Sequence, residues 1–400
     1  MADLTIVGGV YVERCVQPLW DHVYGSGGRA AEAVARLVPG RTRLVSYVGD
    51  LTRPPAEFLA GMAGFALEPV AADYAVSFDY LHPLSTPRIR PDPAGMAPHG
   101  AIAASGDVVL RYGMLEGDAV VEAGVAVYDP QSAFGARPFG WNGSRADRLA
   151  VVLNREEAAS MTGVRDAREA ARLLLLDGAE VVVVKMGGHG ALVATADGTV
   201  TVPAYRTRRV WKIGSGDVFS ATFAALWGCR GLPPGKAADL ASRATAQYCE
   251  TRSLPVADIG ELEGLDLTPV RPGRGRVYLA APFFDLGQRW LVDEARTLLR
   301  SLGADVFSPC HDVGPGPGAI VAPEDIAGLE RSDAVFAVLN GLDAGTIFEV
   351  GYAVRKGIPV VALAQNVRDE DLKMLVGTAC TVVDDFASAL YQAVWRLPPA

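Results

Sequence analysis

The sequence has few cysteines, and their spacing excludes the usual cysteine-based scaffolds. Only five occur in 400 residues, and no two of them form a CxxC pair; they are Cys15, Cys229, Cys249, Cys310 and Cys380. An odd and scattered set argues against a disulfide framework and against a zinc cluster. We therefore expect a cytoplasmic protein with reduced thiols.

The chain also lacks a long apolar run and an excess of basic residues. No run reaches the ~18 residues that cross a bilayer, and the N-terminus, MADLTIVGGVYVERC, has no basic region of the kind that opens a signal peptide. With 37 basic and 46 acidic residues, the net charge is −9. Neither a membrane nor a nucleic acid polymer is therefore an expected partner, although a local phosphate pocket made of backbone N–H groups is compatible with this charge.

The composition instead predicts a folded α/β protein with more than one domain. The apolar fraction of 50% and the charged fraction of 21% are ordinary for a globular chain, and 400 residues suggest two or three domains. The stretch LTPVRPGRGR has two prolines, two glycines and three arginines, which is typical of a linker. We expect domains at 1–266 and 276–400, joined by a linker at 267–275.

Before the linker, short β-branched runs alternate with helical patterns, which predicts α/β units. Helices are expected at Gly28–Leu37 and Arg168–Leu176, and an irregular surface loop at the proline-rich segment Pro83–Pro98. Strands are expected at Leu4–Val7, Arg43–Tyr47, Val125–Tyr128, Leu149–Leu153 and Val181–Lys185.

After the linker, five short runs are apolar throughout rather than alternating, which indicates strands buried on both faces. They predict a five-stranded, doubly wound parallel sheet of the flavodoxin-like kind. Its ligand site should lie beyond the carboxyl ends of the strands. The runs are Val277–Ala281, Asp305–Ser308, Ala334–Leu339, Pro359–Ala364 and Cys380–Val383.

Two motifs in the first domain carry candidate chemistry. Gly214-Ser215-Gly216-Asp217 precedes a helical pattern, so its backbone N–H groups and the helix dipole could hold an anion, and Asp217 could take a proton from a hydroxyl. A simple capped turn is the alternative. Asn154 and Glu157 open another helix and could hold a hydrated Mg²⁺, or they could form a capping box.

In this order and spacing, the two motifs make residues 1 to about 266 resemble the ribokinase-like (PfkB) family of sugar and nucleoside kinases. The matching stretches are VGGVYVE, GSGGRAAEAVARL, YVGD, LNREEA, VVVVKMGGHGALV and IGSGDVFSATFAAL. The resemblance implies an α/β kinase domain that uses ATP and Mg²⁺. It implies Asp217 as catalytic base, Gly214–Gly216 as anion hole, Asn154 and Glu157 near Mg²⁺, and Gly27 and Gly28 near the sugar.

The same domain departs from the family at positions that read the sugar. Glu13 stands where the family has an Asp, Glu32 replaces an Asn, and Trp211-Lys212-Ile213 replaces Asp-Thr-Thr. The segment between Gly113 and Val125 is too short for a strand–helix unit of typical members. We therefore predict a kinase of altered substrate, or a kinase fold that no longer phosphorylates.

A carboxylate cluster marks the second domain. The segment Asp343-Ala-Gly-Thr-Ile-Phe-Glu349 follows an expected strand, and Glu349 opens a helical pattern that would carry it into the crevice at the strand ends. A capping box of Thr346 with Glu349 is the alternative. Asp325 and Asp333 lie upstream on the helix that feeds the same strand, and Tyr278 lies in the first strand, followed by Phe283 and Phe284. Because loops after neighbouring parallel strands meet at one end of the sheet, these side chains could line one cleft. Rings that stack on a base, beside carboxylates that act on a glycosidic bond, suit a sugar–base substrate.

Residues 276–400 resemble the nucleoside 2-deoxyribosyltransferase family, through VYLAAPFF, EDIAGLERSDAVFAVLN and LDAGTIFEVGYAVRKGIPVVAL. The resemblance implies Glu349 as nucleophile, with Tyr278 orienting its carboxylate. It also implies that Asp325 and Asp343 contact the sugar or help protonate the base, while Asp333 orients a loop. Phe283 and Phe284 occupy the base-stacking segment that the resemblance implies. The other candidate substrate-binding residues are Gly345 and Thr346 here, and Glu13, Gly27 and Gly28 in the first domain.

The leading functional prediction is sugar transfer from a nucleoside through a covalent glutamyl intermediate, which requires no cofactor. The alternatives are a PfkB-type kinase as the main activity, an N-glycoside hydrolase, and a kinase fold used only for ligand sensing. The stretch after Tyr278 has no hydroxyl or guanidinium for a phosphate, which favours a nucleoside over a nucleotide. A homo-oligomer is expected because such transferases often complete their site from a neighbouring subunit. The tryptophans Trp20, Trp141, Trp211 and Trp227 are expected in the core or an interface.

Overall fold

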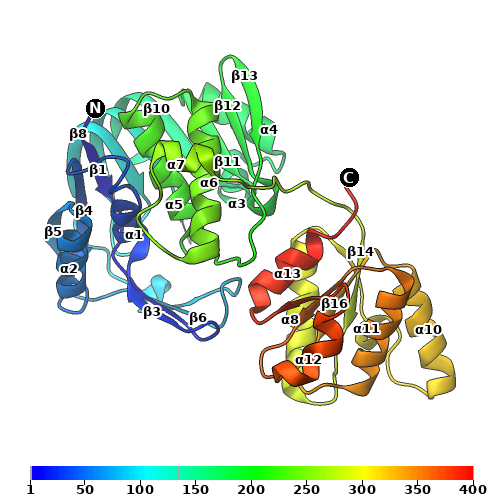
Figure 1. Cartoon of the computed structure of the whole chain (residues 1–400). Helices are drawn as coiled ribbons and strands as arrows, with labels where there is room; N and C mark the ends of the chain where they lie inside the picture. The colour runs from blue at the N-terminus through cyan, green and yellow to red at the C-terminus, as the bar shows by residue number, and fades with distance from the viewer. Residues whose placement is uncertain (1, 133–134, 400) are drawn as a thin grey trace. The chain divides into compact units, whose positions relative to one another are not determined.

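The computed structural model describes residues 2–132 and 135–399, which fall into two compact units (Figure 1). Unit 1 contains the chain up to Thr207 together with Trp211–Pro269, and unit 2 contains Arg208–Val210 together with the chain from Val270 onward. All five cysteines are free. Within the described part of the chain, no helix has the length and apolarity that a membrane span requires. Each unit is an α/β fold, as the sequence predicts.

Unit 1 is built on a nine-stranded mixed sheet. Its strands pair in parallel from β5 to β11, and β12 and β13 extend one edge in the antiparallel sense. All five strands expected in this domain lie within the sheet. Its order is β13 (Gly198–Val202), β12 (Ala191–Thr195), β11 (Val181–Lys185), β10 (Arg145–Asn154), β9 (Ala119–Asp129), β8 (Ile102–Tyr112), β1 (Leu4–Val7), β4 (Thr42–Val48) and β5 (Ala66–Ala71).

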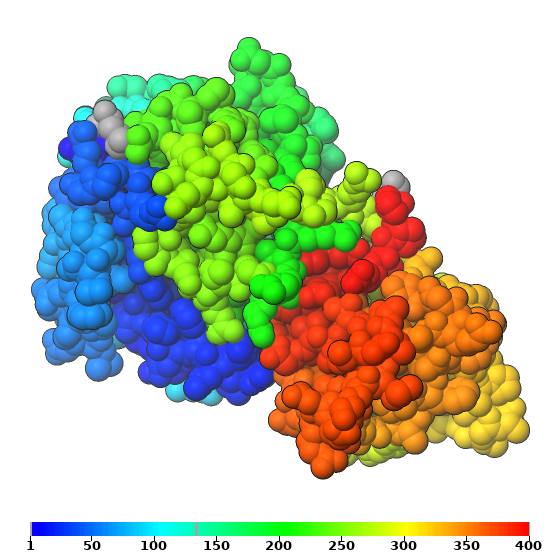
Figure 2. Space-filling model, viewed as in Figure 1, coloured from blue at the N-terminus to red at the C-terminus, as the bar shows by residue number. Residues whose placement is uncertain are grey.

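Helices cover both faces of this sheet because each face carries its own apolar cluster. One cluster joins the sheet to α1 (Gly25–Ala33), α2 (Arg53–Ala63), α5 (Ser215–Phe223), α6 (Pro234–Thr251) and α7 (Ile259–Gly264). The other joins it to α3 (Arg155–Thr162) and α4 (Ala167–Leu176). In the space-filling view, α6 and α7, in yellow-green, form a closed surface on their side of unit 1 (Figure 2).

A second, smaller sheet of unit 1 was not expected from the sequence. It contains β3 (Trp20–Val23), β2 (Val12–Cys15), β6 (Ser77–Tyr80) and β7 (Arg88–Arg90), in that order. The prediction of a wholly irregular loop at Pro83–Pro98 is wrong, since the segment contains β7 and a 3-10 turn at Pro93–Gly95. β7 pairs antiparallel with β6 at the edge of the sheet, where a proline on either side of a three-residue strand is tolerated.

The connection between β8 and β9 departs from ordinary parallel topology. The two strands pair in parallel from Ile102–Ala119 to Tyr112–Asp129, although only Gly113–Asp118 join them. Parallel neighbours normally need a crossover of a dozen or more residues, usually a helix. The expected absence of a strand–helix unit between Gly113 and Val125 is therefore confirmed.

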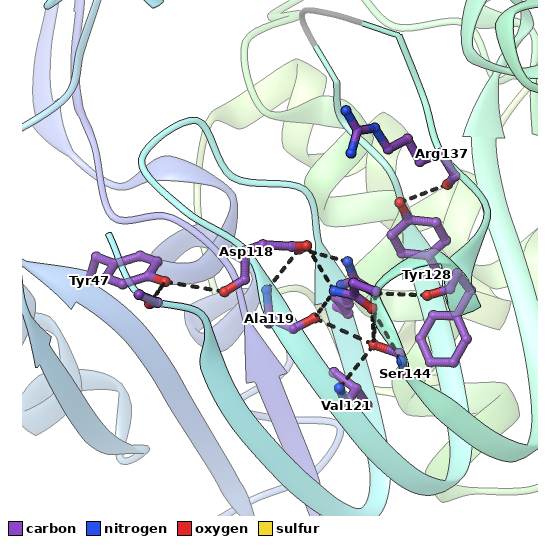
Figure 3. A network of polar contacts seen from close by, with 11 residues as sticks. Tyr47, Asp118, Ala119, Val121, Tyr128, Arg137 and Ser144 are labelled. Atoms are coloured by element: carbon purple, nitrogen blue, oxygen red, sulfur yellow. Dashed lines mark hydrogen bonds and ion pairs between the residues drawn. The ribbon is translucent and has the colours of Figure 1, made fainter. Parts of the chain in front are cut away.

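A buried arginine fixes this short connection. The Arg111 guanidinium donates to Asp118 Oδ1 at 2.7 Å, to Ser144 Oγ at 3.0 Å and to the Phe139 carbonyl at 3.0 Å. Tyr47 Oη donates to the Asp118 carbonyl at 3.1 Å. Figure 3 shows Tyr47, Asp118 and Ser144 within one polar network. These hydrogen bonds hold the short connection in place, although no crossover helix packs beside it.

Unit 2 has the predicted five-stranded parallel sheet. Its order is β15 (Asp305–Phe307), β14 (Arg276–Ala280), β16 (Ala334–Val338), β17 (Val360–Leu363) and β18 (Thr381–Val383). A core on one face contains side chains from α10 (Gly318–Glu330), α11 (Ala344–Lys356) and α12 (Asp369–Val376). The remaining helices are α8 (Leu286–Ser301), α9 (Pro309–Asp312) and α13 (Phe386–Val394). The strand order 2-1-3-4-5 places the switch point beside β14 and β16, where the predicted site residues gather.

Candidate functional site

The centre of the site in unit 2 is a hydrogen bond between a tyrosine and a glutamate from different elements. Tyr278 lies in the middle of β14 with its side chain fully buried. Its hydroxyl donates to Glu349 Oε1 of α11 at 2.6 Å. The structure therefore brings together the two residues that the sequence predicts as orienting group and nucleophile.

Glu349 is not a helix cap. The N-cap of α11 is Asp343, whose Oδ2 accepts from the Thr346 backbone N–H at 2.8 Å and from its hydroxyl at 3.0 Å. The alternative in which Thr346 caps the helix with Glu349 is therefore wrong. Because Asp343 already caps this helix end, the Glu349 carboxylate is available for chemistry.

The surroundings of Glu349 oppose its ionisation. Burial raises its pKa to about 7, the charges of Asp325 and Asp343 add to this effect, and the bond from Tyr278 acts against it. The pKa of Asp325 is also raised, mainly by burial and further by Glu324. Asp325 Oδ1 is buried and has no hydrogen-bond partner among the described residues. Two carboxyl groups with raised pKa values, one of which has an oxygen without a hydrogen-bond partner, are typical of a functional site.

The predicted base-stacking segment lies just after β14. The Phe283 and Phe284 rings stack at 5.6 Å, and the Phe284 side chain is 73% exposed. Asp285 caps α8, and Gln288 Oε1 in turn accepts from the backbone N–H of Phe284 at 2.8 Å. These N–H groups are already occupied and the cap is acidic, so this helix end does not favour a phosphate. The local geometry thus agrees with a substrate that is a nucleoside.

Asp333 lies apart from the other carboxylates. It precedes β16, and its Oδ2 accepts from the Arg276 backbone N–H at 2.8 Å, at the amino ends of the strands. Sequence reasoning gave no role to the end of β15 or to the short helix α9 that follows it. Phe307, the last residue of β15, stacks on Tyr278 with ring centroids 5.6 Å apart. In α9, His311 bridges Ser308 Oγ at 3.0 Å and Asp293 Oδ1 at 2.8 Å. The sequence signal that could have revealed this segment is its position at the carboxyl end of β15, the strand that pairs with β14.

In unit 1, the predicted catalytic base is held by two donors. Asp217 Oδ2 accepts from Arg29 at 2.8 Å, and its Oδ1 accepts from Gln131 Nε2 at 2.6 Å. Arg29 is fully buried and also pairs with Glu13, and its Nε donates to Tyr248 Oη at 3.1 Å. Sequence reasoning missed Arg29 and Gln131, although Arg29 directly follows the Gly27-Gly28 pair.

The predicted anion hole has a positive neighbour. Gly214 caps α5 with φ of 72°, and a Cβ at this position would overlap the Arg29 guanidinium. Lys212 Nζ donates to Ser215 Oγ at 3.1 Å. A Cβ at Gly216 would lie 3.6 Å from Lys185 Nζ. Three basic side chains thus lie near the turn, of which Arg29 and Lys185 are already paired with carboxylates.

Asn154 and Glu157 form the capping box that the sequence left open. Asn154 Oδ1 accepts from Glu157 N–H at 2.9 Å, and Glu157 Oε2 accepts from Asn154 N–H at 2.8 Å. Burial, then the charge of Asp129, raises the pKa of Glu157 to about 7 against the effect of Lys185. Each side chain keeps an oxygen or lone pair for a water shell, so the pair still fits a hydrated Mg²⁺. Asp129 and Lys185, which form a buried ion pair, were missed although both end strands.

Glu13 and Gly27 each make contacts that support the fold of unit 1, whether or not they also touch a ligand. Glu13 accepts from Arg29 and from Gly25 N–H at 3.2 Å, so its charge is compensated inside the protein. A Cβ at Gly27 would lie 2.5 Å from the Gly8 carbonyl oxygen. Gly28 has more room, with Leu59 the nearest contact at 3.6 Å. Gly27 therefore permits the close approach of α1 to the chain that follows β1.

Comparison with known proteins finds a family model that matches a part of each unit. Residues 277–386 match the family model described as nucleoside 2-deoxyribosyltransferase. Residues 149–254 match the model described as pfkB family carbohydrate kinase. The chain is therefore a fusion of a transferase-like and a kinase-like domain, as the two resemblances predict. No curated protein matches it.

Several solved kinases are similar to the chain in fold. A ribokinase from Thermotoga maritima is 16% identical, with 66% of this chain and 99% of that chain covered and a TM-score of 0.46. The phosphofructokinase-2 of Escherichia coli is 13% identical, with 66% and 98% covered and a TM-score of 0.47. A PfkB protein from Polaromonas sp. JS666 is 17% identical, with 66% and 100% covered and a TM-score of 0.46.

Proposed function

We propose that unit 2 cleaves the N-glycosidic bond of a nucleoside and transfers the sugar, and that unit 1 is a kinase fold with altered or lost phosphotransfer. The observation that carries the first part is the Tyr278–Glu349 hydrogen bond of 2.6 Å at the predicted ligand edge of the sheet. The family match over 277–386 supports the same reaction class.

The reaction follows from the positions of the carboxyl groups. Glu349 attacks the anomeric carbon while the bond to the base breaks, which forms an ester between Glu349 and the sugar and releases the base. Asp325, whose Oδ1 is buried without a hydrogen-bond partner among the described residues, donates the proton that the leaving base needs. A second base, or water, then displaces Glu349. Two displacements retain the configuration at the anomeric carbon.

Tyr278 has a positioning task in this scheme. Its hydroxyl holds one oxygen of Glu349, which leaves the other oxygen free to attack. Both burial and the Glu349 charge raise the pKa of Tyr278, so the phenol stays protonated and donates throughout the cycle. No cofactor is required for either displacement.

Base release measured by chromatography tests this proposal. Glu349→Gln should reduce release by several orders of magnitude, because a neutral amide cannot form the ester. The matched control is Glu330→Gln in the same unit, since Glu330 accepts from Tyr352 Oη at the same distance of 2.6 Å but on the surface. Near-normal release by Glu349→Gln, or an equal loss in both variants, would remove Glu349 from the mechanism.

The proposal that unit 1 has altered or lost phosphotransfer rests on the hydrogen bonds of Asp217. Both of its oxygens accept hydrogen bonds, one of them from a fully buried guanidinium, so a sugar hydroxyl would have to share an oxygen with one of these donors. ATP and Mg²⁺ would be held by the Gly214–Gly216 turn and the Asn154–Glu157 pair.

A coupled ADP assay with a sugar and nucleoside panel, run beside base release, separates the two candidate activities. We expect little ADP with ribose or fructose. Efficient ADP formation that is abolished by Asp217→Asn would instead make kinase chemistry a main activity.

A further inference from the structure

The last residue of β15, Phe307, packs against two elements of the site in unit 2. Phe307 and Tyr278 are partners in the parallel ladder, so their side chains lie on the same face of the sheet. Their ring centroids are 5.6 Å apart, and the interplanar angle is 19°. Tyr278 is fully buried and Phe307 is half-buried. One face of the Phe307 ring therefore packs against the side chain that holds Glu349.

The same ring contacts the backbone of α10. A Cβ added at Gly328 would lie 2.3 Å from Cε1 and 2.4 Å from Cζ of Phe307, so a residue with a side chain does not fit there unless the ring or the helix moves. The buried residues of α10 are Gly328 and Leu329, and its first two turns are largely exposed. The position of α10 in unit 2 therefore depends on contacts near Gly328, and the Phe307 ring makes one of them.

Asp325 lies on the face of α10 that meets this ring. It precedes Gly328 by three positions, and residues three apart in a helix are neighbours on one face. Burial is the largest cause of the raised pKa values of Tyr278 and Glu349, and the charge of Asp325 contributes to both. The Phe307 ring therefore lies between the strand that orients Glu349 and the helix that carries Asp325.

Polar contacts hold the chain directly after Phe307. The Ser308 backbone N–H donates to Asp312 Oδ2 at 2.7 Å, and the Ser308 hydroxyl contacts His311 Nδ1 at 3.0 Å. His311 Nε2 contacts Asp293 Oδ1 of α8 at 2.8 Å. These contacts connect the end of β15 to α8 and α9, so the ring is anchored independently of α10.

We propose that Phe307 is a positioning residue of unit 2, whose ring sets the distance between the carboxyl groups of Asp325 and Glu349. The inference rests on the proposed function, in which Asp325 protonates the leaving base while the C–N bond breaks and Glu349 bonds to the anomeric carbon. The effect of Phe307 passes through Tyr278 and α10. When the ring is removed, or pushed from the helix side, proton donation suffers more than attack, because Tyr278 still holds the Glu349 carboxylate.

Two kinds of substrate, tested on the full chain, separate proton donation from attack. The leaving base of 2-deoxyadenosine or thymidine needs a proton, whereas 4-nitrophenyl 2-deoxyriboside releases a stable anion that needs none. Phe307→Leu should lower the turnover of the nucleosides by roughly 10- to 100-fold, and that of the aryl glycoside by less than about 3-fold. Phe336→Leu is the matched control, because Phe336 is a buried phenylalanine of β16 that packs on Phe386 of α13.

Gly328→Ala tests the same spacing from the helix side. Its methyl group would overlap the Phe307 ring, so it should reproduce the selective loss with nucleosides, although alanine is the better helix former. The double variant with Phe307→Leu should turn over nucleosides faster than Gly328→Ala alone, because the smaller side chain leaves room for the methyl group. Circular dichroism checks the fold of each variant, and Gly328→Ala replaces Phe307→Leu if the latter does not fold.

NMR of labelled glutamate carboxyl groups measures the spacing without turnover, with the Glu349 signal assigned by its loss in Glu349→Gln. Burial, and then the charges of Asp325 and Asp343, raise the pKa of Glu349 to about 7 from 4.5. This pKa should fall toward its ordinary value when the ring or the helix is displaced, because water then reaches the carboxylate and the Asp325 charge is farther away.

Three results would overturn the inference. These are an equal loss with both kinds of substrate in Phe307→Leu, the same selective loss in the Phe336→Leu control, or a Glu349 pKa that is unchanged in both Phe307→Leu and Gly328→Ala. If the wild type releases no base but the pKa moves as expected, the proposed function fails while the positioning of the carboxyl groups by Phe307 is supported.

Discussion

Replacing Glu349 by Gln should abolish base release and, at alkaline pH, stabilise unit 2. The folded protein holds the pKa of Glu349 at about 7, against an ordinary value of 4.5. A carboxyl with a raised folded pKa binds its proton more tightly in the folded state, so its ionisation opposes folding. The penalty is absent below pH 4.5, grows as the pH rises toward 7, and is complete above that value.

The size of this effect follows from the shift. Between 4.5 and about 7, at 1.36 kcal/mol per pH unit, the full penalty is about 3 kcal/mol. Glutamine also loses the charge-assisted bond from Tyr278, which lowers the expected gain to about 2 kcal/mol at pH 8. At pH 4.5 or below, the substitution should be neutral or slightly destabilising.

Differential scanning calorimetry of the full chain at pH 4.5 and pH 8 measures this difference, with the two units analysed as separate transitions. Glu330→Gln is the control, since Lys356 and the Tyr352 bond lower the pKa of Glu330 and no alkaline gain is expected from it. A Glu349→Gln variant that is less stable than wild type at pH 8, or equally affected at both pH values, would refute the account of a buried nucleophile with a raised pKa.

Three further predictions concern single groups. The rate of base release at saturating nucleoside should rise through pH 7, because Glu349 must be ionised to attack and is about 10% ionised at pH 6 and about 90% at pH 8; a flat profile from pH 5 to 9 would contradict this. Asp343→Ala should cost about 1 kcal/mol of unfolding free energy in unit 2 through loss of the α11 cap, and an unchanged urea midpoint would exclude the cap. Arg29→Ala should destabilise unit 1 by about 3–5 kcal/mol, because it leaves Glu13 and Asp217 as buried unpaired charges. If the free energy of unfolding in urea falls by less than about 1 kcal/mol, the two carboxylates are hydrated rather than buried without a partner.

The sequence predicts the sheet of unit 2 well because its strands are buried on both faces and form continuous apolar runs. The expected strand Val277–Ala281 is shifted by one residue from the observed β14, and Ala334–Leu339 extends one residue beyond the observed β16. The four-stranded sheet of unit 1 was missed because β2 and β3 are short and mix charged with apolar residues, as in VERC and WDHV. Such patterns do not differ from those of loops.

The chemistry of the sites was predictable in part, for a physical reason. Tyr278 and Glu349 both follow the rule that functional groups gather at one edge of a parallel sheet, so their meeting was expected. Arg29 meets Asp217 across a long stretch of chain, through packing of α1 against α5, and no local pattern encodes that contact. Membership of Arg208–Val210 in unit 2 is likewise a matter of packing, since Val210 N–H bonds Ser388 Oγ at 2.7 Å.

The most direct test of the central claim is mass spectrometry of the covalent intermediate. The protein is mixed with a 2-deoxynucleoside, quenched rapidly in acid and digested. The account predicts the mass of one deoxyribosyl group on the peptide that contains Glu349, and no such mass in the Glu349→Gln variant. Release of base with the sugar attached to another residue, or with inverted configuration in the product, would contradict the assignment of Glu349 as nucleophile.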